Sequence, residues 1–178
     1  MLGRSSVFGS SLAMSATIQT RAKSANRPAR AGAAEIALTA AQKRLVRESF
    51  LKLAPALDLV GQLFYLKLFR LDPAFRARFG TDAETQGRKF MAAVKLGIIA
   101  LNHDDGLAPI IKLLGVRYRQ MGLKARDYRT ITKALIWTLE RSLETKFTPK
   151  TKDAWTVLLT QVTRILSGSD AALLRSVG

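Results

Sequence analysis

The chain has 178 residues, of which 48% are hydrophobic, and this is enough for one domain with a full core. The absence of cysteine excludes disulfides, thiolate zinc sites and iron–sulfur clusters, and no apolar run reaches the ~18 residues that would predict a membrane span. The net charge of +16 suits either a self-repelling solvated surface or contact with an anionic partner.

Residues 1–34 have the composition of a targeting leader. They are rich in serine, alanine and arginine, and they contain five basic residues and no acidic one. They lack the apolar core of a secretory signal. We therefore expect a basic, disordered leader of the mitochondrial transit type, followed by a folded domain over residues 35–178. The alternative is the disordered tail of a bacterial, cytoplasmic protein, and Met1 and Met14 are both open as the start of translation.

The first predicted helix lies within residues 38–55 and begins at a capping box formed by Thr39 and Gln42. A second helix is predicted over residues 58–71, where apolar residues recur at helical spacing. It ends before Asp72-Pro73. The proline suits the first position of a short third helix, because its fixed φ is helical and its missing N–H is not needed there.

The next predicted helix, residues 81–101, opens on a second capping box, Thr81 with Glu84. A polar loop, "NHDDG", follows. A short helix is then predicted over residues 107–114, with Gly115 as the residue that closes it.

Two long amphipathic helices complete the pattern, over residues 125–143 and 147–166. The second has Thr148 as its cap and Pro149 at its first position. Since no segment alternates like a strand, the sequence predicts an all-α fold. Helices of such unequal length favour steep crossings around a pocket over a regular bundle.

The order of several motifs resembles that of a globin. These motifs are "LFYLKLFRLDPAFRARF", "TQGRKFMAAV", "LLGVRYRQMGL" and "FTPKTKDAW", and the similarity extends over residues 38–168. The resemblance implies a globin fold of six to eight helices around a haem-type pocket. Gln86 and Tyr118 are 32 residues apart, which is the separation of the distal and proximal positions in globins.

The resemblance also assigns roles to individual residues around a haem. Tyr65 and Gln86 match the distal pair that hydrogen-bonds bound dioxygen in many bacterial globins. Phe79 matches the aromatic residue that clamps the haem, and Phe90 is the apolar residue one turn beyond Gln86. Lys89 matches a position at the pocket rim, where a cation meets a haem propionate.

Tyr118 stands where globins have the histidine that ligates the iron. The only histidine in the chain, His103, belongs to the polar loop, where we expect a solvated side chain. Tyr118 would therefore be the iron ligand if haem binds, as a phenolate of the kind found in catalase. Phenolate stabilises iron(III), so the resemblance then implies interaction with a diatomic gas in a sensing or redox role rather than reversible oxygen carriage.

Two alternatives stay open at this point. In the first, side chains fill the pocket, and the fold is a haem-free scaffold or an accessory subunit of a larger assembly, docked on an acidic protein partner. In the second, the pocket binds another flat apolar ligand. We expect no enzyme, apart from weak peroxidase-like activity if haem binds. Nucleic acid is not favoured as a partner, because no recognition motif accompanies the charge.

Overall fold

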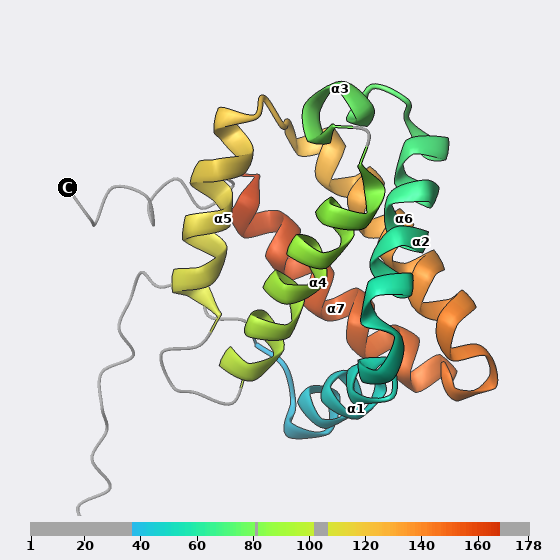
Figure 1. The fold of residues 1–178 in the computed structure, drawn as a ribbon. Helices are drawn as coiled ribbons and strands as arrows, with labels where there is room; N and C mark the ends of the chain where they lie inside the picture. Colours follow the sequence, from blue (N-terminus) through green and yellow to red (C-terminus); the bar gives the residue numbers. More distant parts are fainter. Residues whose placement is uncertain (1–36, 81, 102–106, 168–178) are drawn as a thin grey trace, which may run out of the picture. The chain divides into compact units, whose positions relative to one another are not determined.

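The computed structural model describes residues 37–80, 82–101 and 107–167, so the predicted leader and His103 lie outside the described residues. Within them the chain is helical and contains no strand, which confirms the all-α prediction. The α-helices are α1 (Ala40–Leu51), α2 (Leu57–Leu71), α3 (Phe75–Phe79), α4 (Ala83–Ala100), α5 (Ala108–Gln120), α6 (Ala125–Leu143) and α7 (Pro149–Leu166) (Figure 1). None of these helices combines the length and the hydropathy needed to cross a membrane.

Most of the predicted helix starts agree with the structure. The N–H of Gln42 donates to the Thr39 hydroxyl at 3.1 Å, and the N–H of Thr39 donates to the Gln42 amide oxygen at 3.0 Å, which completes the capping box. Thr148 caps α7 by accepting from the N–H of Thr151. At α4 the predicted cap is wrong, because Asp82 rather than Thr81 accepts from the N–H of Thr85. Thr81 itself lies outside the described residues.

The predicted end of the short helix at Gly115 is also wrong. The helix α5 continues through Gly115 to Gln120, so Tyr118 lies on a helix and not in a loop. A Cβ at Gly115 would lie 3.4 Å from the side chain of Leu166, so this glycine brings α5 close to α7. The helix ends at Gln120, and two residues later the chain turns at Gly122, whose φ of 73° lies in the left-handed region that glycine adopts without strain.

The helices α2 and α4 cross with their backbones in contact (Figure 1). At the crossing point Gly61 of α2 faces Gly87 of α4, and both are buried. A Cβ built on Gly61 would lie 2.7 Å from the carbonyl carbon and oxygen of Gly87. The two glycines therefore set the distance between these helices, and with it the position of Tyr65 relative to Phe90.

A buried hydrogen bond connects the first and last helices. The indole Nε1–H of Trp155 in α7 donates to the hydroxyl oxygen of Ser49 in α1, at 2.9 Å. Both side chains are almost completely buried. The bond satisfies the one polar atom of the tryptophan ring, so the ring can pack in the core without an unpaired donor.

An ion pair connects α3 to the start of α6. The carboxylate of Asp127 is buried, accepts from the backbone N–H of Lys124 at 2.8 Å and pairs with the Arg78 guanidinium at 2.5 Å. Burial alone would raise the pKa of Asp127. The hydrogen bond from Lys124 and the pairing with Arg78 outweigh it and hold the pKa below its ordinary value. This pair holds the segment of Phe79 against α6.

Candidate functional site

Four of the predicted site residues, from four different helices, meet in one aromatic cluster. The Tyr65 ring of α2 lies 5.7 Å from the Phe79 ring of α3 and 6.2 Å from the Phe90 ring of α4, measured between ring centroids. The Tyr118 ring of α5 lies 6.4 Å from Phe79, with its plane at 76° to it. The structure therefore brings the predicted distal and proximal positions together.

The two other predicted residues take no part in these ring contacts. Gln86 is half-buried and Lys89 is exposed, both on α4. The rim position of Lys89 stays a prediction. The resemblance implies that Tyr65 and Gln86 lie together on the distal side of the pocket, opposite Tyr118, and here the structure differs. The cavity next to Tyr118 is lined by Phe90 and Tyr118, but not by Tyr65, Phe79, Gln86 or Lys89.

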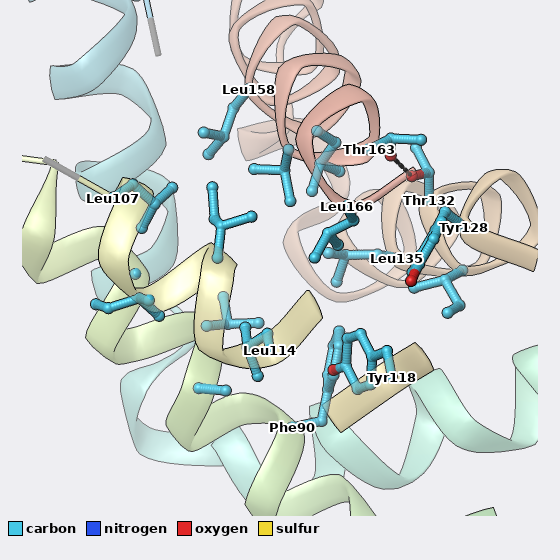
Figure 2. Close-up of a pocket in the computed structure, with 18 of the residues that line it drawn as sticks. Phe90, Leu107, Leu114, Tyr118, Tyr128, Thr132, Leu135, Leu158, Thr163 and Leu166 are labelled. Carbon is cyan, nitrogen blue, oxygen red and sulfur yellow. Dashed lines mark hydrogen bonds between the residues drawn. The ribbon is translucent and has the colours of Figure 1, made fainter. Parts of the chain in front are cut away.

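This cavity lies between α4, α5, α6 and α7 and has a volume of about 120 Å³ (Figure 2). Tyr118 and Phe90 lie together at one end of it, and Leu158 lies toward the other. Its lining is almost entirely aliphatic or aromatic. The lining residues are Phe90, Ala93, Val94, Gly97, Ile98, Leu107, Ile110, Ile111, Leu114, Tyr118, Tyr128, Ile131, Thr132, Leu135, Trp155, Leu158, Leu159, Val162, Thr163 and Leu166.

Apart from Tyr118, the residues with hydroxyl groups in the cavity wall, namely Tyr128, Thr132 and Thr163, were not among the predicted site residues. Tyr128 and Thr132 lie one turn apart on α6, and the hydroxyl of Thr132 is 3.2 Å from that of Thr163 on α7 (Figure 2). The spacing of Tyr128, Thr132 and Leu135 along one helix face was a usable signal in the sequence. No signal in the sequence could have predicted the pairing of Thr132 with Thr163, because this pairing depends on how α6 packs against α7.

Burial raises the pKa of all three tyrosines in the chain above the ordinary phenol value. For Tyr118 the positive charge of Arg117 offsets part of this effect and Tyr128 adds to it. For Tyr65, burial and the nearby Tyr118 both raise the pKa, and Arg117 lowers it. For Tyr128, burial again dominates. The folded protein therefore favours the neutral phenols.

These shifts predict that the tyrosines ionise only when the protein unfolds. Between the unfolded pKa of about 10 and the higher folded values, the unfolded chain binds fewer protons than the folded chain, so stability falls as the pH rises. Below pH ~10 this stabilisation is fully present. In an alkaline titration, phenolate absorbance and loss of helical circular dichroism should rise together. Phenolate appearing near pH 10 with the helices intact would contradict the prediction.

Comparison with known families agrees with this arrangement. A family model for globins matches residues 62–166, which include α2 to α7 apart from the first turn of α2. The chain belongs to the globin family. The matched segment contains every residue of the aromatic cluster and of the cavity wall.

The arrangement of side chains in this globin does not fit a haem. A flat porphyrin that lies between two side chains contacts one of them on each face. Each contact between carbon atoms takes about 3.5 Å, so the two side chains must be about 7 Å apart. The centroids of Phe79 and Tyr118 are only 6.4 Å apart, and one ring points its edge at the other. The adjoining cavity of about 120 Å³ is well below the ~300 Å³ of the smallest common ligand pockets. The phenol of Tyr118, with its raised pKa, replaces the family's neutral imidazole.

Proposed function

We propose that this protein is a haem-free globin that acts as a binding scaffold. The observation that carries the proposal is the edge-to-face contact between Phe79 and Tyr118, the two residues that the resemblance assigns to opposite sides of a haem. Tyr65 and Phe90 pack around the same contact. Aromatic rings in such contacts stabilise the fold by themselves, so the interior needs no cofactor to complete it.

An absorption spectrum of the full chain, expressed with haem supplied, tests this proposal. We expect no Soret band, because uptake would require the Phe79–Tyr118 contact to separate. Tyr118→Phe keeps the ring and should behave in the same way. A Soret band in the parent would contradict the haem-free proposal.

A second function is haem binding through Tyr118, followed by interaction with a diatomic gas. It is favoured by one specific observation, namely that Tyr65, Phe79, Phe90 and Tyr118 occupy neighbouring positions in the order that the family implies. Bound haem would supply a ferric centre, and the phenol oxygen of Tyr118 would have to lose its proton to hold it. The same spectrum separates the two functions, because a Soret band that Tyr118→Phe abolishes would make Tyr118 the ligand.

The scaffold proposal includes an acidic protein partner. Exposed basic side chains gather where α5 ends and α6 begins, and Asp127, the acidic residue of this segment, is buried and paired with Arg78. These exposed residues are Arg117, Arg119, Lys124, Arg126 and Arg129. A surface of one sign attracts a partner of the opposite sign and speeds their association. We further propose import into mitochondria, which rests on the composition of residues 1–34.

A further inference from the structure

Behind the wall of the cavity between α4, α5, α6 and α7 lies a polar group that has no partner among the described residues and is closed off from the void itself. Tyr128 has only 3% of its surface exposed, and its hydroxyl makes no hydrogen bond to any residue that the structure describes. Its ring forms part of the cavity wall, 6.4 Å from the ring of Tyr118. Buried hydroxyl groups in proteins nearly always have a partner, so this one indicates that something else pairs with it.

The lining of the cavity defines the charge of such a partner. None of the lining residues carries a charged side chain, so an anion or a cation would be buried without a counter-ion. The hydroxyls of Thr132 and Thr163 already pair with each other at 3.2 Å. The indole N–H of Trp155 already donates to Ser49, so the hydroxyls of the two tyrosines are the remaining polar side-chain groups in the wall. A ligand that suits this lining is uncharged and mostly apolar, with a single group that forms hydrogen bonds.

The volume of the cavity defines the size of the ligand. An engineered apolar cavity of about 150 Å³ in another protein binds benzene. The cavity here, at about 120 Å³, is slightly smaller and is shaped by ring and branched aliphatic side chains. One six-membered ring is therefore close to the largest body that it can hold without rearrangement.

We propose that this cavity is a binding site for an uncharged, benzene-sized molecule with one hydroxyl group, which forms a hydrogen bond with the hydroxyl of Tyr128 once a small turn of the Tyr128 ring opens that hydroxyl to the cavity. The proposal rests on the haem-free function, because a haem between Phe90 and Tyr118 would change the end of the cavity that these two residues form. The proposed ligand of this cavity is therefore a small organic molecule of the phenol class.

Titration calorimetry of the full chain with phenol, anisole and benzene tests the proposal. We expect phenol to bind the parent about three- to tenfold more tightly than benzene, which corresponds to one net hydrogen bond. Anisole lacks the O–H donor and carries an extra methyl group, so it should bind more weakly than phenol. Tyr128→Phe deletes only the hydroxyl oxygen. It should bind benzene like the parent and lose the preference for phenol.

Val162→Phe provides the control for the location of the site. It adds a ring to the cavity wall and should abolish binding of both phenol and benzene while helical circular dichroism stays unchanged. The comparison of phenol, anisole and benzene on the parent protein tests the proposal even if a variant fails to fold.

Three results would overturn the proposal: no binding of phenol to the parent, equal binding of phenol and benzene, or an undiminished preference for phenol in folded Tyr128→Phe. Equal binding would mean that a water molecule satisfies Tyr128. An absorption spectrum of the same sample keeps the two proposals apart. A Soret band would contradict the haem-free function, whereas absent phenol binding in a sample without that band contradicts only the ligand site.

Discussion

Replacing Gly61 with alanine is expected to destabilise the fold by about 3 kcal/mol or more, which is a large part of the roughly 5–15 kcal/mol that stabilises a domain. The new methyl group would lie 2.7 Å from the backbone carbonyl of Gly87, and backbone atoms cannot rotate away as a side chain can. The clash can be relieved only by moving α2 and α4 apart, which loosens the packing of Phe64 against Phe90. Chemical denaturation followed by circular dichroism measures the loss.

Gly115→Ala is the matched control for this prediction. It also places a methyl group in a helix at a packed position, but the nearest atoms are the side-chain ends of Arg119 at 3.3 Å and Leu166 at 3.4 Å. These atoms can shift, and alanine favours the helix by up to ~1 kcal/mol over glycine. We expect a change within about 1 kcal/mol. If Gly61→Ala is as mild as Gly115→Ala, the close approach of α2 and α4 does not limit stability.

Replacing Tyr118 with histidine is expected to give a protein that takes up haem and shows a Soret band. Histidine supplies the neutral imidazole that globins use as the iron ligand. It also removes the phenol that contacts Phe79 across the space a haem needs. Tyr65, Phe79 and Phe90 already lie around that space. The measurement is the absorption spectrum of the variant, purified after expression with haem supplied.

Tyr118→Phe is the control for the histidine variant, because it keeps a ring of similar bulk and provides no donor atom. It should stay free of haem. If Tyr118→His also takes up no haem while it remains helical, the packing of the surrounding side chains, rather than the missing ligand, closes the space. A Soret band of equal strength in Tyr118→Phe and in the parent would show that Tyr118 does not bind the iron.

The sequence by itself determined the helices and the family. Periodic apolar residues predicted α2, α6 and α7 to within about two residues, because the pattern of 3.6 residues per turn is a local property. The caps at Thr39 and Thr148 follow from side chains that bond to backbone groups three residues away. The order of motifs identified a globin, and this order also brought Tyr65, Phe79, Phe90 and Tyr118 to neighbouring positions.

The tertiary structure alone decided how α5 continues and what remains of the pocket. A glycine such as Gly115 often follows the end of a helix, but here it lies within α5. Because it has no side chain, α5 packs closely against α7 at this point, and the chain turns at Gly122 instead. Whether Tyr118 faces a haem or the edge of Phe79 depends on distances between helices that are far apart in the chain. The same holds for the unpaired hydroxyl of Tyr128, because a missing partner can be recognised only when all four walls of the cavity are in place.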